Sequence, residues 1–407
     1  MKKVCVIGLG YIGLPTATIL ADNGYDVVGC DVNNRVVESL NCGKVIITEP
    51  DLDEIVLRVV KNGKLRACSE AIVADVYVIA VPTPFMEEKK PDLRYVFSAV
   101  SGIINLLAES NLVVLESTSP VGTTEAIAEL IYERRPELVD KLSIAYCPER
   151  VLPGKILREL VENDRIVGGI DEESATAACE FYKTFVKGAV IPTSARTAEM
   201  CKLTENAYRD VNIAFANELS IICDEIAIDV RKLIKLANHH PRVNILSPGP
   251  GVGGHCIAVD PWFIVDKSPK SSRLIKTARQ INDAKPEYIA RKIAEACQQV
   301  NNPVIACLGL AFKADVDDYR ESPSLDVVKL LSIYSPNARI IASDPYISKL
   351  PESLVGLKNV AFMPGFVELC QIASHIVVLT DHSVYKKIGR DLLEGKVIID
   401  TRGIFER

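Results

Sequence analysis

VCVIGLGYIG, residues 4–13, decides how the first part of this 407-residue chain folds. Its apolar, β-branched start predicts a buried strand, and Gly8, Gly10 and Gly13 then follow in the pattern G-x-G-x-x-G. Such glycines permit a tight turn into a helix and let the backbone and the helix N-terminus approach a pyrophosphate. Asp31, at the end of the next apolar run, would accept hydrogen bonds from ribose hydroxyls and repel a 2′-phosphate. The stretch therefore predicts a site for NAD rather than NADP.

The same alternation of apolar runs and helical segments continues through the first part of the chain and returns near its end. Runs rich in Val and Ile, followed by turn residues, are typical of strands in a buried parallel sheet. They lie at 4–8, 26–31, 75–82, 111–117 and 142–148, and again at 303–310, 338–345, 375–381 and 396–403. We predict an α/β chain with two Rossmann-like doubly wound domains. The two could be distant repeats, although no sequence period shows it.

The middle of the chain has a different pattern. Between Thr193 and His240 no glycine or proline occurs, and apolar residues recur three or four positions apart, which predicts one long amphipathic helix or two joined helices. A helix of about 30 residues spans about 45 Å, longer than a small domain is wide. We therefore expect a long-helix central domain that joins the α/β domains and forms a homodimer or higher homo-oligomer. The expected domains are 1–193, 194–300 and 301–407.

Composition narrows the classes of partner. Hydrophobic residues make up 48% and charged residues 25%, as in soluble globular proteins. The net charge of −6, without a basic run, argues against nucleic acid or a membrane as the partner and favours a small ligand. Twelve cysteines lie at scattered spacings and only five histidines are present, so we expect no metal site, no disulfide framework and a cytoplasmic location. The uncharged stretch 4–21 imitates a signal peptide, but its glycines and Pro15 favour ordinary folded structure.

A second glycine-rich stretch, GPGVGGHCIAVDP at 249–261, presents the thiol of Cys256 four residues before Asp260. Most cysteines are small buried hydrophobes, and a purely structural loop is one explanation. The other is a nucleophile, since the glycines leave space around the thiol and put ionisable groups beside it. Because a free thiol is only slightly ionised at neutral pH, a nucleophile here would need positive potential from the loop amides, Lys202 or His255.

Polar residues also follow the predicted strands of the first domain, where the carboxyl ends of parallel strands face the ligand crevice. They include residues 81–84, Thr118 and Glu149. A turn or cap is the commoner role for the hydroxyls, and for Glu149 a salt bridge and a general base are equally good explanations. Lys202 and Asn206, four residues apart, share a face of the long helix. A solvated face is the usual explanation of such a pair, but apolar neighbours favour a partly buried ammonium that stabilises an oxyanion.

Together these motifs resemble the UDP-glucose/GDP-mannose dehydrogenase family of nucleotide-sugar 6-dehydrogenases. The resemblance covers essentially the whole chain and is carried by GLGYIGLP, STSPVGTT, CPERVLPG, KLTEN, GVGGHC with Asp260, and GLAFKADVDDYRESPS at 309–324. It implies an NAD-binding domain, a helical dimerisation domain and a C-terminal domain for the nucleotide of a UDP-sugar. PERVLPG, HPRVNI and GVGGHCIAVDPWF look most like the members that act on UDP-N-acetyl-D-mannosamine. UDP-glucose, UDP-N-acetylglucosamine and GDP-mannose remain open.

The resemblance also implies roles for single residues. Cys256 would carry a thiohemiacetal and then a thioester, so that one NAD site removes two hydrides without releasing an aldehyde. Its expected partners are Lys202 and Asn206 at the oxyanion, Asp260 in proton transfer, Thr118 at a water or the substrate, and Glu149 in thioester hydrolysis. Expected cofactor contacts are Gly8, Gly10, Tyr11, Ile12, Gly13, Asp31, Arg35, Pro82, Thr83, Thr118 and Arg320. Expected substrate contacts are Glu149, Arg150, Val151, Lys202, Asn206, Arg209, His240, Arg242 (from a neighbouring subunit), Gly253 and Lys313.

Two departures and two other classes of protein bear on this interpretation. Pro153 stands where UDP-glucose dehydrogenases have a second glutamate, and Arg242 lies two residues closer to the cysteine than in those enzymes; both fit an altered sugar pocket. One alternative is a 3-hydroxyacid-type dehydrogenase, which removes a single hydride and needs neither Cys256 nor the second α/β domain. The other is a non-enzymatic NAD or redox sensor in which Cys256 oxidises reversibly.

Overall fold

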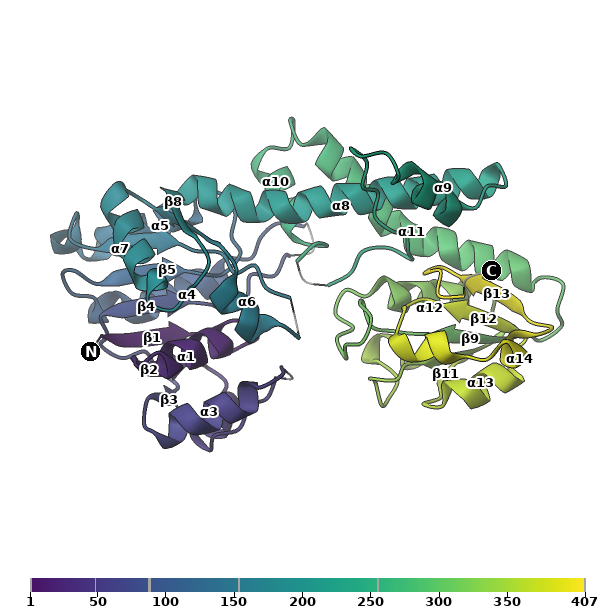
Figure 1. The fold of residues 1–407 in the computed structure, drawn as a ribbon, viewed down its shortest axis with the longest axis horizontal. Helices are drawn as coiled ribbons and strands as arrows, with labels where there is room; N and C mark the ends of the chain where they lie inside the picture. Colours follow the sequence, from purple (N-terminus) through teal and green to yellow (C-terminus); the bar gives the residue numbers. More distant parts are fainter. Residues whose placement is uncertain (1, 48, 87–88, 153, 255, 406–407) are drawn as a thin grey trace. The chain divides into compact units, whose positions relative to one another are not determined.

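The structure, a computed structural model, describes residues 2–47, 49–86, 89–152, 154–254 and 256–405. They divide into two compact units, the first of residues 1–205 with 262–267 and the second of residues 206–261 with 268–407. Each unit contains a sheet with helices packed against it, and long helices connect the two parts of the sequence (Figure 1). The predicted fold class is confirmed, whereas the three expected domain ranges stay a prediction.

The sheet of unit 1 has eight strands in the order β3-β2-β1-β4-β5-β6-β7-β8. The strands are β1 (Lys3–Ile7), β2 (Asp26–Cys30), β3 (Leu65–Cys68), β4 (Val76–Ile79), β5 (Leu112–Leu115), β6 (Ser143–Tyr146), β7 (Arg165–Gly169) and β8 (Val190–Ser194). The helices are α1 (Gly13–Asp22), α2 (Asn34–Asn41), α3 (Leu52–Lys61), α4 (Arg94–Ile103), α5 (Thr123–Arg134), α6 (Ile156–Glu162) and α7 (Glu172–Lys183). All neighbouring strands are parallel except β6 and β7, which are antiparallel.

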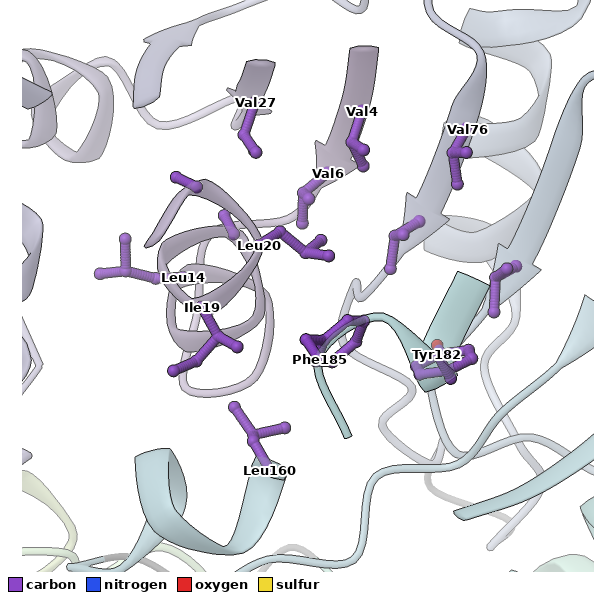
Figure 2. Packing of buried hydrophobic residues seen from close by; sticks show 14 of the residues in the cluster. Val4, Val6, Leu14, Ile19, Leu20, Val27, Val76, Leu160, Tyr182 and Phe185 are labelled. Carbon is purple, nitrogen blue, oxygen red and sulfur yellow. The ribbon is translucent and has the colours of Figure 1, made fainter. Parts of the chain in front are cut away.

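Successive side chains of each strand point to opposite faces of the sheet, so this sheet has an apolar core on each face. Val4 and Val6 of β1 belong to one apolar cluster, which Leu14 and Leu20 of α1 also join, while Cys5 and Ile7 belong to the cluster on the other face. Figure 2 shows α1 packed over the first of these faces. Burial of both faces explains why the strands appear in the sequence as continuous apolar runs.

Three strands of this sheet were not predicted. β3 has only four residues and includes the exposed Arg66, and β8 lies at the edge of the sheet with Pro192 exposed. β7 begins with a buried arginine and ends with two glycines. None of these segments has the long apolar run that indicates a buried strand. β3 and β8 are edge strands, which are covered on fewer sides, and the inner strand β7 has only two apolar residues between Arg165 and its glycines.

In the middle of the chain, the expected long helical stretch forms α8 (Ala195–Glu225) and α9 (Val230–Ala237). α10 (Asp260–Lys267) and α11 (Arg273–Cys297) follow. Within unit 2, α8 and α11 share a buried polar network: Arg279 pairs with Asp210 at 2.5 Å, and Asn282 donates to the same carboxylate at 2.8 Å. A buried charge is costly unless it is paired and hydrogen-bonded, so this network fixes the register of the two helices.

The sheet near the C-terminus is entirely parallel, with the order β11-β10-β9-β12-β13. Its elements are β9 (Val304–Leu308), α12 (Pro323–Tyr334), β10 (Arg339–Ser343), β11 (Val360–Phe362), α13 (Phe366–Ile372), β12 (His375–Val378), α14 (Arg390–Leu393) and β13 (Val397–Asp400). Only the three-residue β11 was not predicted. Among the described residues, no helix combines the length and apolar composition needed to cross a membrane.

The turns after β1 and β9 have the same backbone arrangement. Gly8 has a φ of 91° and donates its N–H to the carbonyl at the end of β2 at 2.8 Å; Gly309 has a φ of 90° and donates to the end of β10 at 2.8 Å. The next residue in each turn donates to an aspartate that follows the neighbouring strand, Asp31 at 2.8 Å and Asp344 at 2.7 Å. The two sheets are thus structural repeats at this point, although no sequence period reveals it.

Candidate active site

The glycines of the turn after β1 have different physical roles. A Cβ at Gly13 would lie 1.8 Å from the carbonyl oxygen of Gly8, and a Cβ at Gly8 would lie 2.6 Å from the oxygen of Ala80, so neither position has room for a side chain. Gly10 is exposed and has no atom within 4 Å of its Cβ position. The fold therefore requires two of the glycines, while the third leaves open space above the turn.

Asp31 and the start of α1 fit the expected NAD site. The two carboxylate oxygens accept from the N–H groups of Leu9 and Asn33, each at 2.8 Å, and keep further lone pairs for ribose hydroxyls. The N-cap residue of α1, Ile12, gives no side-chain hydrogen bond, and the first turn contains no acidic residue. An anionic pyrophosphate at this helix end would meet a favourable dipole.

The remaining cofactor candidates of unit 1 lie at or near the carboxyl ends of β1, β2, β4 and β5. Tyr11, Ile12, Thr83 and Thr118 are half-buried, whereas Arg35 and Pro82 are exposed. Their contacts with a cofactor stay predictions.

Glu149 and Lys202 are brought together in unit 1. Glu149 follows β6 and is buried, and its Oε1 has no hydrogen-bond partner. The buried Lys202 donates from Nζ to the backbone oxygen of Glu149 at 2.7 Å. Burial raises the pKa of the Glu149 carboxyl to about 7, although the charges of Lys202 and Arg165 act to lower it. A carboxyl of this pKa exchanges protons readily near neutral pH.

The residues after Glu149 are held mainly by protein contacts. Arg150 forms an ion pair with Glu205 at 2.6 Å and donates to the backbone oxygen of Asp164 at 2.5 Å, and Val151 is half-buried. A substrate contact from Arg150 would therefore have to compete with its ion pair.

The nucleophile candidate is anchored in unit 2. The backbone oxygen of Cys256 accepts from the N–H groups of Val259 and Asp260, at 3.0 and 2.8 Å, and the cysteine is half-buried. Asp260 begins α10, is buried, and accepts from Nδ2 of Asn206 at 2.6 Å. Cys256, Asp260 and Asn206 thus form one hydrogen-bonded group. His255, the other proposed source of positive potential, lies outside the described residues.

Packing alone accounts for two glycines of this loop. A Cβ at Gly253 would lie 2.4 Å from the oxygen of Glu321, and at Gly254, whose φ is 81°, it would lie 2.9 Å from the ring of Phe312. These glycines face the segment 312–323 rather than open space, so the space that we expected them to provide for a ligand is filled by protein. A ligand contact of Gly253 stays a prediction for its backbone.

The other substrate and cofactor candidates of unit 2 lie at the surface. Arg209, His240 and Arg242 are exposed, and Lys313 is half-buried. Arg320 is exposed and pairs with Asp318 at 2.6 Å, while its backbone oxygen accepts from Gly254 at 3.2 Å.

Two buried carboxylates near the unit 1 candidates were not predicted as site residues, although Glu116 ends a predicted strand. Glu116, at the end of β5, accepts from Tyr182 at 2.6 Å and Thr16 at 3.2 Å, and burial raises its pKa. Glu199 of α8 accepts from the N–H groups of Gly122 and Thr124 at the start of α5, at 2.6 and 2.8 Å. Both join elements far apart in sequence, which a local pattern does not show.

Comparison with known proteins gives matches over nearly the whole chain. Residues 2–186, 196–284 and 306–407 match the NAD binding, central and UDP binding domains of the UDP-glucose/GDP-mannose dehydrogenase family. An NDP-N-acetyl-D-galactosaminuronic acid dehydrogenase from Ralstonia solanacearum is 51% identical over 99% of this chain and 96% of its own. A UDP-N-acetyl-D-mannosamine dehydrogenase from Campylobacter jejuni is 51% identical over 96% and 98%. The structure of the UDP-N-acetyl-mannosamine dehydrogenase from Staphylococcus aureus, 40% identical, matches with a TM-score of 0.89 over 100% of this chain and 96% of its own.

Substitutions can distinguish Gly13, which the packing requires, from Gly10, which leaves open space above the turn. We expect Gly13→Ala to lower the thermal stability of the protein, because its methyl group overlaps the Gly8 oxygen. Gly10→Ala should leave the stability near wild type but weaken NAD binding by about tenfold, or about 1.4 kcal/mol. Thermal melts and calorimetric titration with NAD measure the two effects. Unchanged NAD affinity in Gly10→Ala would place the cofactor elsewhere.

Proposed function

Because this chain belongs to the UDP-glucose/GDP-mannose dehydrogenase family and is an NAD-dependent nucleotide-sugar dehydrogenase, we propose that it oxidises the C6 alcohol of UDP-N-acetyl-D-mannosamine to a carboxylate. The full-length similarity to relatives named for this substrate supports the sugar. The Ralstonia solanacearum relative favours a second candidate, the N-acetyl-D-galactosamine nucleotide. Both sugars carry an acetamido group, and they differ in the orientation of ring substituents, which a few pocket contacts decide.

The half-buried Cys256, whose backbone oxygen accepts from the N–H group of Asp260 at the start of α10, is the observation that supports a covalent route. NAD, held at the Gly8–Gly13 turn and Asp31, would accept a hydride in each of two oxidations. After the first oxidation, the Cys256 sulfur adds to the C6 aldehyde and gives a thiohemiacetal. Oxidation of this adduct leaves a thioester, and water cleaves the C–S bond to release the carboxylate and the thiol. The tether keeps the aldehyde in the site between the two oxidations.

We propose roles in proton transfer and charge stabilisation for four further side chains. The ammonium of Lys202 and the amide of Asn206 are the proposed donors to the C6 oxygen as negative charge develops on it. Asp260, which already accepts from Asn206, is the proposed proton acceptor. Glu149 is the proposed base for the water that attacks the thioester, since its raised pKa lets the carboxylate take up a proton near neutral pH.

We also propose that the central region, 194–300, forms a dimer through α8. Four large apolar side chains of this helix are exposed: Tyr208, Phe215, Ile222 and Met200. The first three are seven residues apart and therefore line one side of the helix. A contiguous exposed apolar stripe is rarely left uncovered, and a second copy of the same helix would cover it. The interface of such a dimer would lie next to Arg209, which is on the same helix.

No disulfide joins the described cysteines. Reduced thiols are usual in a cytoplasm kept reducing by glutathione and thioredoxin, and we propose that the enzyme acts there.

The proposed reaction can be checked by counting NADH. We expect UDP-N-acetyl-D-mannosamine to give two NADH per sugar, because oxidation of an alcohol to a carboxylate removes two hydrides. The assay panel should include UDP-N-acetyl-D-galactosamine, UDP-glucose, UDP-N-acetylglucosamine and GDP-mannose. Cys256→Ser should form no uronate. One NADH per sugar in the wild type, or full turnover in Cys256→Ser, would contradict the covalent route.

The pH dependence tests the role of Glu149. A base must be ionised, and the pKa of about 7 means that the ionised fraction falls as the pH drops through neutrality. We therefore expect kcat of the wild type to decrease on the acid side of about pH 7. Glu149→Gln should be slow throughout and lack this acid limb. If the limb persists with the same midpoint in the variant, another group titrates.

The dimer is tested at the apolar stripe. Phe215→Glu puts a charge in the proposed interface and should convert the dimer to a monomer, as measured by light scattering during gel filtration. Ile333→Glu is the matched control, because this residue is also exposed and apolar but lies on α12. Equal masses for wild type and Phe215→Glu would place any interface elsewhere.

A further inference from the structure

Three loops at the carboxyl edge of the C-terminal sheet meet at one buried histidine, His382. Its side chain is fully buried, with Nδ1 3.0 Å from the backbone N of Asp315 and Nε2 3.1 Å from Oδ2 of Asp344. A backbone N–H can only donate, so Nδ1 must accept and the ring proton must lie on Nε2, which donates to Asp344. The neutral imidazole thus links the loops after β9, β10 and β12.

Comparison of the two repeated turns shows what is particular to the second one. Asp31 and Asp344 both accept from the turn that follows the first strand of their sheet. Asp31 is half-buried and keeps a side open for a ribose, whereas Asp344 is fully buried and contacts the imidazole of His382. Its Oδ2 also accepts from Ala311, which stands in the place of Gly10, at 3.1 Å. His382 therefore covers a carboxylate oxygen of Asp344, whereas Asp31 has only backbone N–H groups as partners among the described residues and keeps lone pairs for a ligand.

The loop held by His382 is the one that carries Lys313. Asp315 has a φ of 60°, a conformation that residues other than glycine adopt only at a cost. Besides the bond to His382, Asp315 accepts from the N–H and hydroxyl of Ser383, at 2.9 and 2.5 Å, and from the hydroxyl of Tyr346 at 3.2 Å. These contacts fix the backbone two residues after Lys313. Anchoring the loop at this point limits the positions from which the Lys313 side chain can extend.

We propose that His382 is a positioning residue that holds Lys313 for the UDP moiety of the substrate, through the hydrogen bond from Asp315 to Nδ1. This inference rests on the proposed function and on the substrate contact that the family resemblance implies for Lys313. His382 itself touches neither substrate nor cofactor. Its Nε2–H donates to Asp344 the kind of hydrogen bond that a ribose hydroxyl is expected to donate to Asp31. The turn after β9 thereby supports the loop that carries Lys313.

Two substitutions test separately the hydrogen bonds of the two imidazole nitrogens of His382. In His382→Asn the side-chain oxygen replaces Nδ1 and can still accept from Asp315, but the contact with Asp344 is lost. In His382→Gln the side-chain nitrogen replaces Nε2 and can still donate to Asp344, but Asp315 loses its acceptor. We expect KM for the UDP-sugar to stay near wild type in His382→Asn and to rise about tenfold in His382→Gln, the loss typical of one buried hydrogen bond. KM for NAD should not change, and kcat should change less than KM.

His375 provides the matched control. It is also fully buried and begins β12, so it lies at the opposite end of that strand from His382, and it contacts Oγ of Ser374 at 2.9 Å and the oxygen of Ala296 at 3.2 Å. His375→Gln should lower the melting temperature without altering KM for the UDP-sugar. If His382→Asn and His382→Gln raise KM equally, or if His382→Gln leaves it unchanged, the positioning role is wrong.

Titration with UDP alone distinguishes failure of this inference from failure of the proposed function. If the wild type oxidises no nucleotide sugar of the panel, the proposed function is wrong, but the affinity for UDP still tests the anchored loop. We expect UDP to bind His382→Asn like the wild type and His382→Gln about tenfold more weakly. Equal UDP affinity in all three proteins would overturn the role of His382.

Discussion

The fold of unit 1 depends on the close approach of two backbone segments, where a Cβ at Gly13 would lie 1.8 Å from the oxygen of Gly8. This contact allows the start of α1 to approach the end of β1 closely, and the right-handed connection to β2 sets the face of the sheet that α1 covers. It also directs the first amides of α1 toward the open space at Gly10. The same steric constraint therefore fixes both the packing of Leu14 and Leu20 in the core and the place where a pyrophosphate can bind.

Burial changes the proton affinity of the catalytic candidates and fixes the positions of their polar groups. Glu149 is removed from water with one oxygen unpaired, so its proton affinity rises into the range of an acid–base catalyst. Lys202 is held against the backbone of the same residue, and Asn206 and Asp260 are held by each other. Such pre-positioned groups need little rearrangement when charge develops on a substrate, which is why enzymes keep polar groups in otherwise costly environments.

Much of this arrangement could be predicted from the sequence, because it depends on local patterns. Buried parallel strands, the G-x-G-x-x-G turn and the long helices each have a clear periodic or compositional signal. Edge strands such as β8 and contacts between distant segments, such as Glu199 with the start of α5, have none. The loop glycines show a further limit: a sequence shows that Gly253 lacks a side chain, but only the structure shows that the freed volume is taken by Glu321.

The paired turns after β1 and β9 illustrate how one backbone arrangement can have two different uses. The second copy keeps its glycine, its aspartate and their hydrogen bonds, and an imidazole from a neighbouring loop satisfies the carboxylate permanently. An internal group is always present at full occupancy, so the turn no longer alternates between empty and liganded states. The same backbone geometry can thus serve as a reversible binding site in one domain and as fixed structural support in another.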